Sequence, residues 1–136
     1  MNSSLELRNI KEALKEAKRD ETVGIRITKL TGNDTVAIYA AEIDGYKRVG
    51  AHYHTEGIEL YQVVEGTGSI YIGLPKSDGE VDWKEPVAVA AGDCFTVNAG
   101  EVHQLVNSSS KQLIIVFVCP YSHISTDRTV VDGFSE

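Results

Sequence analysis

From about Val23 onward the sequence is a succession of short apolar or alternating runs, and this pattern limits the possible fold more than any other feature. Residues 24–30 (GIRITKL) alternate apolar and polar side chains, and residues 35–43 (TVAIYAAEI) form a longer apolar run. Runs of this composition are typical of β-strands. Turn-forming sequences separate the later runs: TEG, EGTG, PKSDGE, AAGD, NAGE and NSSSK. Many short strands with frequent turns predict an all-β sandwich or small barrel over residues 21–120.

The N-terminal segment, residues 1–20, is the only part of the sequence with clear helical periodicity. One apolar stripe at spacings of three and four residues is formed by Leu7, Ile10, Leu14 and Ala17. Ser3 and Glu6 have the spacing of a capping box. This pattern predicts an amphipathic helix that covers one face or edge of the β-structure. Residues 121–136 are polar and weakly patterned, and we interpret them as a C-terminal tail.

Composition and charge disfavour several classes of partner. The length of 136 residues suggests one domain. The net charge is −7 and the isoelectric point is near 5.1. Nucleic acids and anionic membranes attract basic faces, so neither is an expected partner. The N-terminus lacks the apolar core of a signal peptide, and no apolar run has the length of a membrane span, so we expect a cytoplasmic protein.

The two cysteines, Cys94 and Cys119, lie far apart and form no C-x-x-C pattern. This spacing is typical neither of a disulfide framework nor of a zinc knuckle. Both lie in apolar, strand-like runs, and we predict that both are buried free thiols.

Residues 50–66 (GAHYHTEGIELYQVVEG) carry a possible metal site. In a strand, alternate side chains point to the same face, so His52 and His54 should lie side by side. The turn that follows, at Gly57, can reverse the chain and bring Glu59 back toward them. Imidazoles with a carboxylate suit a first-row transition metal: imidazole favours Zn, Cu, Fe and Ni, and carboxylate also admits Mn. Without further ligands, three polar side chains on an ordinary strand would be the simpler interpretation.

A fourth candidate ligand, His103, follows the glycine-rich turn of residues 98–101 (NAGE), and the two stretches together resemble the two conserved motifs of the cupin superfamily. The first motif, G-x5-H-x-H-x(3,4)-E-x6-G, is matched by His52, His54, Glu59 and Gly66. The second, G-x5-P-x-G-x2-H-x3-N, is matched by Gly92, Gly100, His103 and Asn107. The sequence departs from the motifs at two positions: the opening glycine is one residue early, at Gly45, and Asn98 replaces the proline.

This resemblance, which covers residues 35–118, implies a double-stranded β-helix, or jelly-roll barrel, with a metal inside. The family's ligand positions fall on His52, His54, Glu59 and His103. The resemblance implies a divalent transition metal ion (Fe, Mn, Zn or Ni) with two coordination positions open to a small-molecule ligand or substrate. It also favours a homodimer. Metal binding requires neutral histidines, so metal affinity should fall below about pH 6.

Several other side chains have open roles. Tyr61 shares the face of Glu59 and could line a pocket or pack in the core. His123 lies outside both motifs, and we interpret it as solvated or locally hydrogen-bonded rather than as a ligand. Glu56 should be exposed, and Gln104 should face away from His103. Trp83 could cap the barrel or contact a partner. The residues interpreted as core are Phe95, Val97, Ile115 and Phe117.

Two classes of function remain. The first is a metal-dependent enzyme acting on a small polar metabolite, with dioxygenase, decarboxylase or sugar isomerase chemistry, as the resemblance implies. The second is a non-catalytic cupin that binds or senses a small, sugar-like molecule. The sequence shows no second catalytic group that would decide between them.

Overall fold

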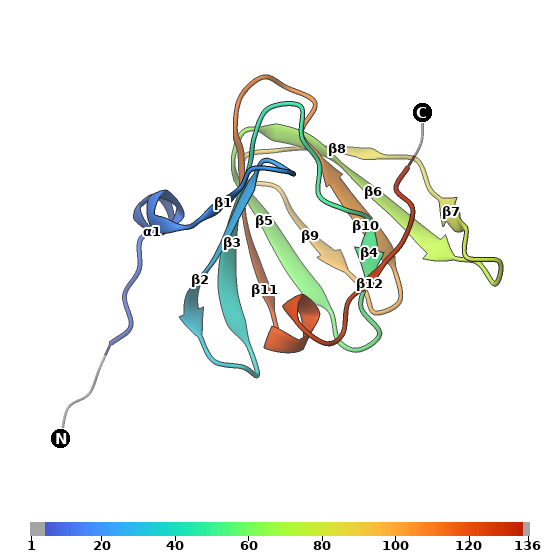
Figure 1. The fold of residues 1–136 in the computed structure, drawn as a ribbon, viewed down its shortest axis with the longest axis horizontal. Helices are drawn as coiled ribbons and strands as arrows, with labels where there is room; N and C mark the ends of the chain where they lie inside the picture. Colours follow the sequence, from blue (N-terminus) through green and yellow to red (C-terminus); the bar gives the residue numbers. More distant parts are fainter. Residues whose placement is uncertain (1–4, 135–136) are drawn as a thin grey trace.

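The structure is a computed structural model that describes residues 5–134. Two antiparallel sheets face each other and form a jelly-roll barrel, as predicted (Figure 1). One sheet has the strand order β1-β2-β3-β11-β5-β9, and the other has the order β12-β4-β10-β6-β7, with β8 also paired to β6. The elements are α1 (Ile10–Glu16), β1 (Arg19–Asp20), β2 (Ile25–Gly32), β3 (Ala37–Ile43), β4 (His52–Tyr53), β5 (Glu59–Glu65), β6 (Thr67–Pro75), β7 (Val81–Trp83), β8 (Val87–Ala90), β9 (Cys94–Val97), β10 (Val102–Val106), β11 (Leu113–Cys119), the 3-10 helix η1 (Tyr121–Ile124) and β12 (Thr129–Val130).

The core lies between the two sheets and follows from the alternation along the strands. In β11, at the middle of the first sheet, every second side chain points inward from Leu113 to Cys119. β11 pairs with β3 on one side and β5 on the other, and both contribute buried residues to the same cluster. Of the predicted core residues, three are buried and Phe95 packs against the cluster from β9. The buried three are Val97, Ile115 and Phe117.

A second, smaller cluster lies on the outer face of the first sheet, where α1 packs. Leu14 of the helix is 2% exposed and packs with Leu30, Ala40 and Ile114 from three strands. The helix therefore covers one face of the sheet, as expected.

The helix is shorter than the predicted range. It begins at Ile10, because the side chain of Asn9 accepts hydrogen bonds from the backbone N–H groups of Lys11 and Glu12 and caps the first turn. Leu7 precedes the helix and is 83% exposed. Of the predicted capping pair, Ser3 lies outside the described residues. Within residues 5–134, no helix has the length and apolar character needed to cross a membrane.

The C-terminal segment is part of the barrel. After β11 the chain forms η1 and then β12, which pairs with β4 through Thr129 and Val130. Further along, the Phe134 ring lies against Tyr71 and Trp83 (ring centroids 4.6 and 6.0 Å away). Trp83 itself is on β7, which pairs with β6 at the sheet edge. The segment after residue 120 thus crosses the second sheet next to β4 (Figure 1).

The prediction for the cysteines is correct for Cys119 and wrong for Cys94. Cys119 faces the core and is 1% exposed. Cys94 is exposed, because it occupies an outward-facing position of β9, the last strand of its sheet. Its neighbour Phe95 takes the inward position.

Candidate metal centre

Three of the predicted ligands come from the second sheet and its β4 connection. His52 lies in β4 and His103 lies directly opposite it in β10. His54 follows two residues after His52, just past the end of β4. The ring centroids of His52 and His103 are 4.2 Å apart, and those of His54 and His103 are 5.3 Å apart. One ligand atom from each ring lies within 4.8 Å of the other two.

Each of these rings offers its Nδ1 atom to a backbone carbonyl. Nδ1 of His52 lies 2.7 Å from the Gly50 oxygen, and Nδ1 of His54 lies 2.6 Å from the Asp127 oxygen. Nδ1 of His103 lies 3.4 Å from the Glu101 oxygen. A carbonyl only accepts, so these contacts place the proton on Nδ1 and leave the lone pair on Nε2.

The Nε2 atoms of His54 and His103 are buried and have no hydrogen-bond partner among the described residues. Leaving buried polar atoms unsatisfied costs free energy, typically about 1–3 kcal/mol each. A divalent metal ion would satisfy both atoms at once, because neutral imidazoles with a free Nε2 are metal ligands. The donors present therefore fit a transition metal.

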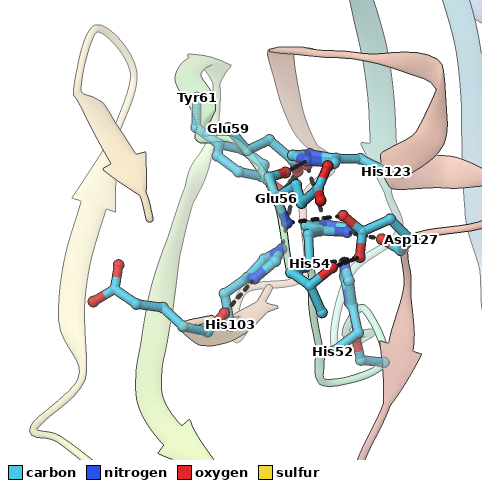
Figure 2. A network of polar contacts seen from close by, with 11 residues as sticks. His52, His54, Glu56, Glu59, Tyr61, His103, His123 and Asp127 are labelled. Carbon is cyan, nitrogen blue, oxygen red and sulfur yellow. Dashed lines mark hydrogen bonds and ion pairs between the residues drawn. The ribbon is translucent and has the colours of Figure 1, made fainter. Parts of the chain in front are cut away.

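Glu59 reaches the cluster from the opposite sheet, at the start of β5 (Figure 2). Its Oε2 lies 3.1 Å from Nε2 of His54, and its Oε1 lies 3.9 Å from Nε2 of His103. The hydroxyl of Tyr61 donates a hydrogen bond to Oε1. The structure thus brings together all four predicted ligand residues, each less than a tenth exposed.

The protonation of the cluster also suits cation binding. Burial lowers the pKa of His52 to about 3 and that of His103 to about 4. Burial alone would raise the pKa of Glu59, but its close contact with His54 and the hydrogen bond from Tyr61 outweigh it and lower this pKa to about 2. At neutral pH the cluster therefore offers two neutral imidazoles and a carboxylate.

His54 is the exception, because its pKa is raised. Burial acts to lower this pKa, but the contacts with the Glu59 carboxylate and the Asp127 carbonyl outweigh it. Of the three imidazoles, His54 is thus the one whose proton competes most with a metal ion.

His123 belongs to this site, although sequence reasoning placed it outside. It is 1% exposed and lies in η1, and its ring stacks on that of His54 with centroids 4.0 Å apart. Nδ1 of His123 lies 2.8 Å from Oε2 of Glu59, and Nε2 lies 2.6 Å from the Glu56 carbonyl oxygen. The expectation of a solvated side chain is therefore wrong, and its hydrogen bonds are long-range rather than local. Together, His54, Glu59 and His123 form a second cluster of potential ligand atoms.

Asp127 is a second residue that the sequence analysis missed. Its carboxylate accepts hydrogen bonds from the Thr55 backbone N–H (2.7 Å), the Thr55 hydroxyl (2.8 Å) and the Glu56 backbone N–H (3.0 Å). These bonds fix the turn between the second histidine and Glu59. Glu56 itself is exposed, as expected. The position of Asp127 follows from the strand pairing: β11 runs antiparallel to β5 with Val118 opposite Leu60, so the chain that leaves β11 starts near Glu59.

The remaining side chains with open roles are also placed. Tyr61 lines the cavity beside the cluster and also packs in the core, where its ring stacks on Phe95 and Phe117. Burial, followed by the nearby Glu59 charge, raises the pKa of Tyr61 well above 10. Gln104 turns away from the cluster and hydrogen-bonds to the backbone of Val49 and Phe134.

The fold and the histidine–carboxylate cluster define a small double-stranded β-helix protein with a candidate metal centre in its barrel. A family model described as the cupin domain matches residues 42–119. The chain therefore belongs to the cupin family, as its two motifs indicated. A search of curated protein sequences gives no match.

Solved structures share this fold at low sequence identity. A Klebsiella pneumoniae protein with a double-stranded β-helix domain has a TM-score of 0.71 at 17% identity, over 96% of this chain and 100% of its own. KdgF from Halomonas sp. has a TM-score of 0.62 at 17% identity, over 77% of this chain and 86% of its own. Recombinant oxalate oxidase in complex with glycolate has a TM-score of 0.62 at 19% identity, over 78% of this chain and 56% of its own. At these identities the likeness shows the fold alone.

Proposed function

We propose that this protein is a metal-dependent cupin enzyme that acts on a small molecule inside the barrel. The ligands would be the Nε2 atoms of His52, His54 and His103 and the carboxylate of Glu59. The observation that carries the proposal is the pair of buried, unpartnered Nε2 atoms beside the Glu59 carboxylate. Fe, Mn, Zn and Ni all accept this set of nitrogen and oxygen donors.

The residues around the cluster hold the ligands in place. The carbonyl contacts at Nδ1 fix the tautomer and the ring plane of each histidine. Tyr61 and His123 hydrogen-bond to different oxygens of Glu59, so the carboxylate is held on both sides. A bound divalent ion would supply Lewis acidity and, if it is redox-active, electron exchange with dioxygen.

Dioxygenase, decarboxylase and isomerase chemistry all fit such a centre. The likeness to oxalate oxidase, whose structure holds glycolate, is consistent with a small oxygen-rich substrate, but it rests on the fold. A direct test is elemental analysis of the purified protein, followed by assays for oxygen consumption and for aldose–ketose conversion. We expect a bound transition metal in the wild-type protein and loss of that metal in His54→Ala.

The chain offers a matched control for this test. His123 is the one histidine not proposed as a ligand, so His123→Asn should still bind metal where His54→Ala does not. A protein that stays metal-free after titration with Mn²⁺, Co²⁺, Ni²⁺ and Zn²⁺, with normal folding, would contradict the proposal. Global unfolding of His54→Ala would instead show that the metal has a structural role.

A non-catalytic, small-molecule-binding cupin is the second candidate, and one observation favours it. The Tyr61 hydroxyl already donates to Glu59 and has a pKa raised well above 10, so it is a poor general acid or base at neutral pH. Metal-dependent ligand binding without turnover of any candidate metabolite would support this alternative, for sugar-like ligands in particular.

We also propose that the protein is a homodimer. Support comes from the outer face of the first sheet, where Ile38 is 38% and Leu60 is 43% exposed, close to Val116 and Val118. An apolar sheet face of this kind is a typical interface. Sedimentation as a monomer at micromolar concentration would contradict this proposal.

A further inference from the structure

The cavity beside the candidate metal centre has two chemically different parts. One part is the histidine–carboxylate cluster with Tyr61 and Arg128. The other part is aliphatic and aromatic. It is lined by side chains that include Ile25, Ile27, Val49, Leu105, Ile115 and Phe117. The cavity volume is about 70 Å³. At about 10–15 Å³ per water-sized position, this is room for roughly five to seven heavy atoms.

Nearly all polar side chains of the cavity already have partners. The Tyr61 hydroxyl donates to Glu59, and both ring nitrogens of His123 contact acceptor oxygens. With a metal on the other histidines and Glu59, these groups are committed as well. Arg128 is the exception, because it is exposed, lines the cavity and forms no ion pair with any residue in the described range 5–134.

The charge of Arg128 acts on the same space as the cluster. Arg128 lines the same cavity as His52, His54, Glu59 and His103. Among the side chains that line the cavity, Glu59 is the only carboxylate, so a divalent ion and Arg128 would together bring three positive charges against one negative charge. This excess favours an anionic ligand, and a guanidinium is suited to a planar carboxylate.

The apolar part of the cavity restricts the rest of the ligand. Its aliphatic side chains offer no hydrogen bond, so each hydroxyl of a sugar-like ligand placed there would lose its water without replacement. The apolar lining also extends outward, because Ile27 is 49% and Ile124 is 38% exposed. A hydrocarbon body gains free energy from this surface, whereas a polyol does not.

We propose that the ligand class of this site is a small monocarboxylate with an aliphatic body. Its carboxylate lies between the metal position and the Arg128 guanidinium, and its carbon chain lies against the apolar wall that contains Ile25, Val49 and Leu105. This inference rests on the proposed metal site and narrows its ligand: Arg128 selects for charge, and the wall selects against hydroxyl groups.

Three probes of equal size test both parts of the proposal. Butanoate carries the charge and the aliphatic body, butanamide lacks the charge, and 3-hydroxypropanoate replaces the terminal methyl with a hydroxyl. Binding is measured by isothermal titration calorimetry on the Zn²⁺-loaded protein, because Zn²⁺ is redox-inert. We expect butanoate to bind at least about tenfold more tightly than butanamide, and several-fold more tightly than 3-hydroxypropanoate.

The matched variants are Arg128→Met, which keeps the aliphatic stem, and Arg128→Lys, which keeps the charge. Because Arg128 is exposed, neither change should affect folding. Arg128→Met should weaken butanoate binding about tenfold, leave butanamide binding unchanged and leave the zinc content unchanged. Arg128→Lys should retain part of the preference for butanoate over butanamide.

The proposal is overturned if butanoate does not bind at millimolar concentration, if it binds no better than butanamide, or if Arg128→Met leaves its Kd unchanged. Tighter binding of 3-hydroxypropanoate than of butanoate would overturn the apolar-body part. Failure of the metal site is a separate result, seen as absence of zinc. In that case, butanoate binding to wild type and to Arg128→Met is compared on metal-free protein by NMR titration. Equal affinity of the two proteins for butanoate overturns the inference.

Discussion

Nδ1 of His123 lies 2.8 Å from Oε2 of Glu59, although the two residues are 64 positions apart in the sequence. The contact joins the segment after β11 to the one carboxylate of the candidate metal centre. The other ring nitrogen of His123 reaches the Glu56 carbonyl, so the ring spans the turn that carries Glu59. His123 therefore sets the orientation of a proposed ligand without being a proposed ligand itself.

Replacing His123 should weaken metal binding without abolishing it. Loss of an outer hydrogen-bond partner typically lowers metal affinity by about 10–100-fold, and His123→Ala removes the donor to Oε2 of Glu59. The measurement is competition for Co²⁺ or Zn²⁺ against a chelator of known affinity. His123→Asn places an amide donor near the position of Nδ1 and should restore part of the affinity. Equal losses in the Ala and Asn variants would mean that His123 acts only through packing.

Metal-free protein should lose stability as the pH falls from about 6.5 toward 4. The folded-state pKa values of His52 and His103, about 3 and about 4, lie below the ordinary value of 6.5 because both rings are buried. In this window the unfolded chain binds more protons than the folded chain, so the free energy of unfolding falls with pH, by up to about 1.4 kcal/mol per pH unit for each histidine. The raised pKa of His54 acts in the opposite sense and offsets part of this slope.

Urea unfolding in the presence of a chelator, between about pH 7 and pH 5, measures this dependence. His52→Gln should flatten the slope, because one of the two depressed groups is gone. Val89→Ala is the control: Val89 is buried and is not part of the cluster, so its substitution should lower the stability equally at each pH. An unchanged slope in His52→Gln would contradict the lowered pKa of His52 as a cause of the pH dependence.

The carboxylate of Asp127 should hold the turn between His54 and Glu59. It accepts three hydrogen bonds from Thr55 and Glu56. Asp127→Ala should therefore lower the free energy of unfolding by about 1–2 kcal/mol and accelerate hydrogen exchange at the Thr55 and Glu56 amides. Asp132→Ala is the matched control, because Asp132 is an exposed carboxylate in the same segment. Unchanged exchange at both amides in Asp127→Ala would refute this role.

The sequence predicted the parts of the site that depend on local geometry. Strand alternation and one turn relate His52, His54 and Glu59, and the second motif supplies His103 at the position opposite His52. His123 was misjudged because its partners lie 64 and 67 positions away, and no local pattern encodes such a contact. The helix start was also misjudged: Asn9 caps the helix, which begins at Ile10, and the spacing of Ser3 and Glu6 did not indicate this position.

The departures from the family motifs have local explanations in the structure. The backbone N–H of Asn98, at the position of the motif's proline, donates to the carboxylate of Glu101 (2.7 Å), a bond that proline has no hydrogen to form. Asn107, which keeps the motif residue, donates to the carbonyl oxygens of Ile43, Asp44 and Lys111 and holds the neighbouring turn together. These hydrogen bonds show that residues of the second motif stabilise turns, in addition to supplying His103.

The other departure predicts a stabilising substitution. The residue six positions before His52, where the motif has glycine, is Tyr46, which has a φ of 62°, the only positive φ among the described non-glycine residues. A side chain in this left-handed region typically costs about 1–2 kcal/mol, and at 72% exposure the tyrosine ring recovers little by packing. Glycine adopts this φ readily but loses more freedom on folding, so Tyr46→Gly should raise the free energy of unfolding by about 1 kcal/mol net.

Thermal or urea unfolding measures the change. Tyr46→Ala is the control, because alanine removes the ring yet keeps the Cβ atom that causes the strain, and it should give no gain. Equal stabilisation by Ala and Gly would show that the exposed ring, and not the backbone conformation, is unfavourable at this position.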